Sequence, residues 1–115
     1  MIIRRGDICL LVLDPVMGSE ISKTRPALIV SNDINNRFSG TLTVLPITSK
    51  KLQKIYPFEV FLPKGMGNLP KNSKVTADQI RTLDKRRFVK FIGAVDADIM
   101  ENVETAMKTH LQIKS

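Results

Sequence analysis

The chain has 115 residues, which is enough for one compact domain with an apolar core and too few for two. Apolar residues make up 43% of the chain and charged residues 25%, which excludes the compositions that stay disordered. With 18 Lys and Arg against 11 Asp and Glu, the net charge of +7 favours a polyanionic partner: nucleic acid, an acidic protein segment or an anionic membrane surface.

The N-terminal segment does not have the pattern of a targeting or membrane segment. Its apolar run, residues 8–13, follows Asp7 directly and is far too short for a signal peptide or a membrane span. We therefore expect a cytoplasmic protein with no membrane partner. Cys9 is the single cysteine, so an internal disulfide is excluded, and its place in the apolar run predicts a buried small hydrophobe.

Apolar runs of strand length, separated by turn-forming residues, follow one another along most of the chain. The turn signals include Asp14-Pro15, the Asn-rich stretch 32–36, and a loop at 63–73 with two Gly and two Pro. The pattern is typical of an antiparallel β meander. The predicted strands are residues 8–13, 27–31, 41–48, 58–62, 74–83 and 89–95.

The C-terminal segment changes period. From Asp96 onward, apolar residues recur at three- and four-residue spacing as far as Leu111, while Asp96 and Asp98 suit the start of a helix. The sequence therefore predicts one amphipathic helix packed on a small, strongly bent antiparallel sheet or barrel. We interpret residues 1–115 as a single domain of mainly β structure.

The residue inventory excludes several kinds of chemistry. His110 is the only histidine and falls on or beside the apolar face of the predicted helix, so we interpret it as a packed side chain. One His and one Cys cannot build a zinc site, and no glycine-rich loop has phosphate-binding spacing. Asp96 and Asp98 suit helix capping better than metal binding, so we expect neither metal nor cofactor. An enzyme of this composition would use arginine, hydroxyl and carboxylate groups, which suits phosphate chemistry.

Six motifs are spread along the chain: "RRGDI" at 4–8, "GSE" at 18–20, "RPALIVSND" at 25–33, "NRFS" at 36–39, "PITSK" at 46–50 and "QIRTLDKRR" at 79–87. In order and interval, this set resembles the MazF/PemK toxins of bacterial type II toxin-antitoxin systems. The resemblance spans essentially the whole chain and implies an SH3-like barrel of the MazF/CcdB type and a homodimer. It also implies a metal-independent endoribonuclease (an mRNA interferase) that cuts single-stranded RNA at short sequences, and a cognate MazE-like antitoxin whose acidic, flexible tail covers the RNA groove.

The resemblance places the catalytic pair on Arg25 and Thr48. Pro26 biases Arg25 toward an extended conformation, which aims the guanidinium in a defined direction at the start of a strand. Its planar fork of N–H donors suits a phosphodiester attacked by a 2′-hydroxyl, a reaction that gives 2′,3′-cyclic phosphate and 5′-hydroxyl ends. Proton transfer would pass through Thr48, water or the phosphate. The alternatives are an arginine paired with Glu20 or solvated, and a threonine that simply ends a strand.

Six further residues are predicted to bind RNA. Glu20 is expected to orient Arg25 or to accept from a base edge, unless it is a solvated loop carboxylate. Gln79 and Arg81, two residues apart, are expected on one face of a strand. Residues 50–58 mix cations with aromatic rings in the way that single strands use for phosphate contact and stacking, although the rings equally suit the core. The predicted RNA-binding set is Glu20, Lys23, Lys50, Lys51, Gln79 and Arg81.

Two other functions share this fold. A non-catalytic toxin, like the CcdB-like poisons of DNA gyrase, would act by binding alone, and it would be expected to rely on residues of the C-terminal helix. That segment has no aromatic anchor after residue 96, and the joint presence of Arg25 and Thr48 favours the nuclease. An RNA-binding protein without activity is the third possibility, and no matched catalytic position supports it.

Overall fold

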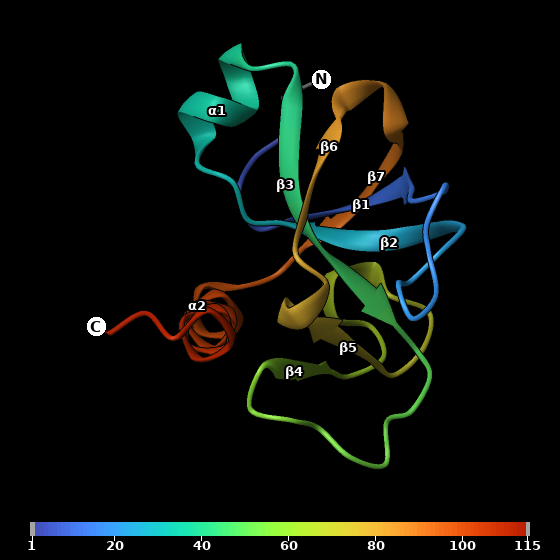
Figure 1. Cartoon of the computed structure of the whole chain (residues 1–115), viewed down its shortest axis with the longest axis vertical. Coiled ribbons are helices and arrows are strands. Elements are labelled where there is room, and N and C mark those ends of the chain that lie inside the picture. The colour runs from blue at the N-terminus through green and yellow to red at the C-terminus, as the bar shows by residue number, and fades with distance from the viewer. Residues whose placement is uncertain (1, 115) are drawn as a thin grey trace.

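The computed structural model describes residues 2–114 and consists of seven strands, two α-helices and three short 3-10 turns (Figure 1). The helices are α1 (Asp33–Phe38) and α2 (Ala97–Leu111), and the turns are η1 (Met66–Asn68), η2 (Ala77–Gln79) and η3 (Lys85–Arg87). The strands are β1 (Asp7–Val12), β2 (Thr24–Ile29), β3 (Thr41–Thr48), β4 (Glu59–Leu62), β5 (Ser73–Thr76), β6 (Arg81–Asp84) and β7 (Phe88–Ala94).

The long strand β3 organises the sheet. The strands run in the order β4-β5-β3-β2-β1-β7 with every neighbour antiparallel, and β6 pairs with the first half of β3 while β5 pairs with its last two residues. The predicted mainly β fold with a C-terminal helix is confirmed. The sheet of residues 2–114 is open, however, because β4 and β7 end it without pairing to each other. A barrel closed by strand pairing is therefore not formed.

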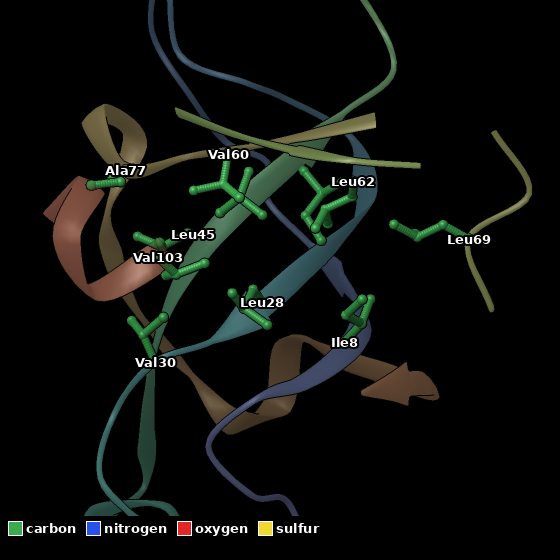
Figure 2. Close-up of a cluster of buried hydrophobic side chains, with 12 residues drawn as sticks. Ile8, Leu28, Val30, Leu45, Val60, Leu62, Leu69, Ala77 and Val103 are labelled. Atoms are coloured by element: carbon green, nitrogen blue, oxygen red, sulfur yellow. The ribbon is translucent and has the colours of Figure 1, made fainter. Parts of the chain in front are cut away.

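The three central strands are buried on both faces. In β2, Leu28 belongs to one hydrophobic cluster and its neighbours Ala27 and Ile29 to another, and β3 alternates in the same way. Figure 2 shows the first cluster, in which Leu28, Leu45 and Val103 lie between the sheet and α2. Burial on both faces explains why these strands appear as continuous apolar runs and not as alternating ones.

Helix α2 begins and packs as its sequence predicts. The Asp96 carboxylate caps it by accepting a hydrogen bond from the Ile99 amide at 2.8 Å, and Val103 and Ala106 are buried against the sheet. His110 differs from the expectation, because it is exposed on the last turn with its ring 5.8 Å from that of Phe58. In the described part of the chain, no helix has the length and apolar character needed to span a membrane.

Two parts of the structure differ from the elements that the sequence predicts. Residues 33–38 form α1, whose cap Asn32 accepts a hydrogen bond from the Asn35 amide at 2.8 Å, where the sequence indicated a turn. The predicted strand 74–83 is divided into β5 and β6 by η2, where the Ala77 amide donates to the Phe58 carbonyl at 3.0 Å. This bond fixes the bend between β5 and β6.

Cys9 is fully buried in the second cluster, as the sequence predicts. Burial, aided by the negative charge of Asp7, raises the pKa of the Cys9 thiol to about 12. Because the thiolate is the reactive form, Cys9 is chemically inert in the folded protein at neutral pH.

Candidate functional site: a cation-lined cleft at the end of β3

An open cleft of about 300 Å³ lies where the β1–β2 loop, the end of β3 and the β5–η2 segment meet. In Figure 1 the β1–β2 loop hangs beside the arrowhead of β3, on the side of the molecule away from α2. Six of the predicted site residues line this cleft: Glu20, Arg25, Thr48, Lys50, Lys51 and Gln79.

Strand register brings the two predicted catalytic residues together. Strands β2 and β3 pair with Ala27 opposite Pro46, and the same register continued by two residues sets Arg25 level with Thr48. Both side chains therefore leave the same face of the sheet, just beyond the end of the ladder. Both side chains line the same cleft, so one bound anion can contact the two of them.

Arg25 is half-buried in β2, opposite Leu11 of β1. Its Nε donates to the Ser22 carbonyl at 3.2 Å, which fixes the plane of the guanidinium. Within residues 2–114 that is its one side-chain hydrogen bond, and it forms no ion pair, so the terminal N–H groups are available to a ligand. The pairing with Glu20 is not formed, because the Glu20 carboxylate accepts from the Met17 amide in its own loop at 2.7 Å.

Thr48 is the last residue of β3 and lies opposite Lys74 of β5. Its Oγ1 accepts a hydrogen bond from the Lys50 amide at 3.1 Å, which sets the direction of the hydroxyl at the start of the β3–β4 loop. A hydroxyl that accepts in this way keeps its own hydrogen free to donate. Thr48 can therefore donate toward an anion bound beside Arg25.

A buried ion pair lines part of the cleft, and it was not predicted from the sequence. Lys74 Nζ lies 3.0 Å from a Glu59 carboxylate oxygen, and the two side chains are only 5% and 8% exposed. The same ammonium donates to the carbonyls of Lys51 at 2.9 Å and Lys54 at 3.4 Å. The pair thereby attaches the β3–β4 loop to strands β4 and β5. The only sign of the pair in the sequence is a lysine within the short segment "SKVT". In the structure this segment is β5, and all four of its residues are buried.

Gln79 and Arg81 both contact the β1–β2 loop. They do not share a strand face as predicted, because Gln79 ends η2 and Arg81 begins β6. Gln79 Oε1 accepts from the Ile21 amide at 3.1 Å and from an Arg81 terminal nitrogen at 3.3 Å, and that nitrogen also donates to the Ile21 carbonyl at 3.1 Å. The two side chains thus hold the β1–β2 loop that carries Glu20. Arg81 lines a small adjoining depression and not the main cleft.

The three predicted lysines have different positions. Lys50 and Lys51 are exposed at the cleft, where they add positive charge beside Arg25. Lys23 does not line it. Its backbone has a positive φ of 71°, its amide donates to the Asp14 carboxylate at 2.9 Å, and its carbonyl accepts from Leu13. Lys23 therefore shapes the β1–β2 loop through its backbone.

The charges at the cleft suit an anion of phosphate type. Arg25, Lys50 and Lys51 present cationic donors, and one wall offers the Thr48 hydroxyl. Three carboxylates also line the cleft: Glu20 accepts from the Met17 amide, Glu59 is paired with Lys74, and Asp78 is the third. Among residues 2–114, no three His, Cys, Asp or Glu side chains gather closely enough to hold a metal ion. The chemistry that these side chains themselves provide is stabilisation of negative charge and transfer of a proton at a hydroxyl.

The fold is that of solved MazF toxins. The crystal structure of MazF (Form-I) from Deinococcus radiodurans is 32% identical, with 98% of this chain and 99% of that chain covered at a TM-score of 0.84. A structure described as an endoribonuclease in complex with its cognate antitoxin, from a Mycobacterial species, has a TM-score of 0.79 at 26% identity and 97% coverage of both chains.

Sequence comparison agrees with the fold. The family described as "PemK-like, MazF-like toxin of type II toxin-antitoxin system" matches residues 4–111, and the chain belongs to this family. Among curated proteins, it is 39% identical to Endoribonuclease MazF9 of Mycobacterium tuberculosis (strain ATCC 25618 / H37Rv) over 117 residues, covering 97% of this chain and 98% of the relative.

Proposed function

We propose that this protein is the toxin of a type II toxin-antitoxin system and acts as a sequence-specific endoribonuclease on single-stranded RNA. The observation that carries the proposal is the convergence of Arg25, with free terminal N–H groups, and the Thr48 hydroxyl at one cation-lined cleft. Similarity over nearly the full length to a protein named an endoribonuclease supports the same activity.

In the proposed reaction, the RNA 2′-oxygen attacks the adjacent phosphorus. The 2′-oxygen to phosphorus bond forms, the bond from phosphorus to the 5′-oxygen breaks, and the products carry a 2′,3′-cyclic phosphate and a 5′-hydroxyl. Negative charge grows on the non-bridging oxygens during this step, where the fork of Arg25 can donate two hydrogen bonds. A guanidinium is a delocalised cation that does not give up its proton in proteins, so Arg25 stabilises charge and does not act as the base.

Proton transfer is assigned to the other groups at the phosphate. The attacking 2′-hydroxyl loses a proton and the leaving 5′-oxygen gains one. The Thr48 hydroxyl can both donate and accept, so it can relay a proton directly or through water, and the phosphate oxygens can take part as well. Every group in this scheme belongs to the chain, the substrate or the solvent.

The remaining predicted residues take supporting roles in this proposal. Lys50 and Lys51 contact phosphates on either side of the cleaved bond, while Gln79 and Arg81 keep the β1–β2 loop, and with it Glu20, in place for base contact. A partner with an acidic, flexible segment would compete for the same cations, which is the proposed mode of antitoxin binding. We also propose a homodimer that works in the cytoplasm.

The test is to incubate the purified protein with a long single-stranded RNA in excess chelator and to sequence the new ends. We expect discrete cuts with 5′-hydroxyl ends. Arg25→Ala should lower the cleavage rate by about 10²-fold or more, which is the usual effect of removing one donor to a developing oxyanion. The matched control is Arg86→Ala, because Arg86 is exposed on η3, outside the cleft, and is paired only with Asp84.

Two further results distinguish the proposed mechanism from its alternatives. Arg25→Lys should remain impaired because an ammonium is not a planar fork, so nearly full activity in that variant would contradict two-point stabilisation of the phosphate. Intact RNA after incubation with folded wild-type protein would overturn the nuclease and leave a toxin that acts by binding alone.

A further inference from the structure

The β3–β4 loop carries an aromatic pair that the proposed chemistry does not use. The rings of Tyr56 and Phe58 are stacked, with centroids 5.3 Å apart and planes only 7° from parallel. Phe58 is partly buried against the hydrophobic core and its other neighbour is the His110 ring, so it anchors the stack. Tyr56 is the outer ring of the stack and is 43% exposed, so one face of it is open to a ligand.

A cation completes this outer surface. Lys54 Nζ lies 4.7 Å from the centre of the Tyr56 ring, within the range of a cation–π contact. The two residues line a depression of about 390 Å³, which shares four lining residues with the catalytic cleft: Lys51, Glu59, Lys74 and Asp78. A strand of nucleic acid that leaves the cleft past Lys51 therefore meets an aromatic face with an ammonium beside it.

The stack is held in place before any ligand arrives. The Tyr56 amide donates to the Glu59 carboxylate at 3.0 Å, and the Glu59 amide donates back to the Tyr56 carbonyl at 2.9 Å. The same Glu59 carboxylate is paired with buried Lys74, which also binds the Lys54 carbonyl. A ligand that stacks on Tyr56 thus pays little ordering entropy, which is the general source of affinity at preorganised sites.

We propose that the exposed face of Tyr56 is a stacking subsite for a base of the single-stranded RNA, next to the nucleotides at the cleavage cleft, with Lys54 contacting a phosphate of the same strand. The inference rests on the proposed function and adds a residue that binds the substrate outside the reacting groups. A flat ring beside a flexible cation is the combination that single-strand binding proteins use, and stacking of this kind tolerates any base. An acidic peptide would use the lysines but gain nothing from the ring.

The chain offers a direct signal for this test, because Tyr56 is its only tyrosine and it has no tryptophan. Intrinsic fluorescence therefore reports on this one ring. The probes are 2′-O-methyl oligoadenosine, which lacks the attacking hydroxyl, and an abasic strand of equal length and charge. We expect oligoadenosine to quench the emission at saturation and the abasic strand to leave it nearly unchanged. Equal quenching by both strands, or quenching by a polyglutamate peptide, would overturn a base-stacking subsite.

Variants give a second readout through the anisotropy of a labelled oligoadenosine. Tyr56→Ala should weaken its binding roughly 5- to 100-fold, the effect of removing one stacked base contact. Tyr56→Phe, which keeps the ring, should bind nearly as the wild type does. Phe91→Ala is the matched control, because Phe91 is 44% exposed on β7 at the opposite end of the sheet order. Unchanged affinity in Tyr56→Ala would overturn the subsite.

The two proposals fail separately. Cleavage of RNA by a wild-type protein whose tyrosine emission is not quenched would overturn the subsite alone. Quenching by oligoadenosine without cleavage of any RNA would overturn the nuclease and leave the subsite as part of a binding protein.

Discussion

The two loops that border the cleft are held to the sheet in opposite ways. The β1–β2 loop, residues 13–23, is attached by several polar contacts from exposed or half-buried side chains, among them Gln79 to the Ile21 amide and Arg81 to the Ile21 carbonyl. Asp14 braces the loop internally by accepting from the Lys23 amide. Arg87 of η3 adds bonds to the carbonyls of Val12 and Asp14. The β3–β4 loop, residues 49–58, instead depends chiefly on the buried Lys74–Glu59 pair, since the ammonium donates to the carbonyls of Lys51 and Lys54 and the carboxylate accepts from the Tyr56 amide.

This difference predicts different responses to damage. Each partly hydrated hydrogen bond of the β1–β2 loop contributes about 0.5–1.5 kcal/mol, so the loop should loosen in small steps as bonds are removed one by one. A buried charge cannot lose its partner without a large penalty, so the β3–β4 loop should fail at a single position. The contacts of the β1–β2 loop can therefore be lost one at a time, whereas those of the β3–β4 loop depend together on one buried pair.

The largest effect is expected at Lys74. Lys74→Met leaves the buried Glu59 carboxylate without its cation and should lower the free energy of unfolding by about 3–5 kcal/mol. Urea unfolding measures the change, and limited proteolysis should cut within residues 50–58. A loss below about 1 kcal/mol, the median for a surface pair, would show that the ion pair is hydrated in solution and would remove the contrast between the loops.

A double variant sharpens this result. Lys74→Met combined with Glu59→Leu removes both charges, so it should be more stable than Lys74→Met alone by at least about 1–2 kcal/mol, because no uncompensated charge remains. The loop carbonyls of Lys51 and Lys54 still lose their donor. Protection of the loop against protease should therefore not recover with stability. If both recover together, the ammonium is not what holds the loop.

An intermediate effect is expected at Gln79. Gln79→Ala removes the acceptor of the Ile21 amide and one partner of Arg81, and should cost about 1 kcal/mol. Hydrogen exchange should speed up at Ile21 while amides of the central strands β1 to β3 keep their protection. A uniform rise in exchange across the sheet would mean that this loop, too, is coupled to global unfolding.

The smallest effect is expected at Asp14. Asp14→Ala removes an exposed acceptor of the Lys23 amide and should change the free energy of unfolding by no more than about 0.5 kcal/mol, as for most surface substitutions. Asp14→Asn keeps an acceptor oxygen and serves as the matched control. Thermal unfolding of the two variants side by side measures the difference, and a loss of several kcal/mol in Asp14→Ala would show that this loop also depends on a single contact.

Sequence reasoning recovered the elements whose signal is continuous. The central strands and α2 have long apolar runs or a clear helical period, and their positions agree with the structure. Helix α1 was missed because its six residues, rich in Asn and Asp, are typical of turns, and its stability comes from capping and from the buried Asn36. The bend at η2 depends on a bond to Phe58, which is distant in sequence and therefore leaves no local signal.

The candidate site shows the same division. Arg25 and Thr48 were placed at strand ends by motif resemblance, and the β2–β3 register explains why they share one cleft. Lys74 and Glu59 could not be found, because alternation along a strand places a lysine outward and only the three-dimensional fold covers it. Gln79 lines the cleft, but its hydrogen bond to the Ile21 amide joins segments that are distant in sequence and therefore leaves no local signal.

The pairing of β1 with β7 has a consequence for how the molecule folds. Asp7 pairs with Ala94, so two strands that are far apart along the chain must meet before this part of the sheet is complete. Long-range pairing of this kind slows folding, because the entropy of closing a long loop is lost before the contacts form. Until β7 pairs with it, one edge of β1 presents unpaired backbone groups, which are a template for pairing with another chain. An incompletely folded copy is therefore open at this edge to another protein.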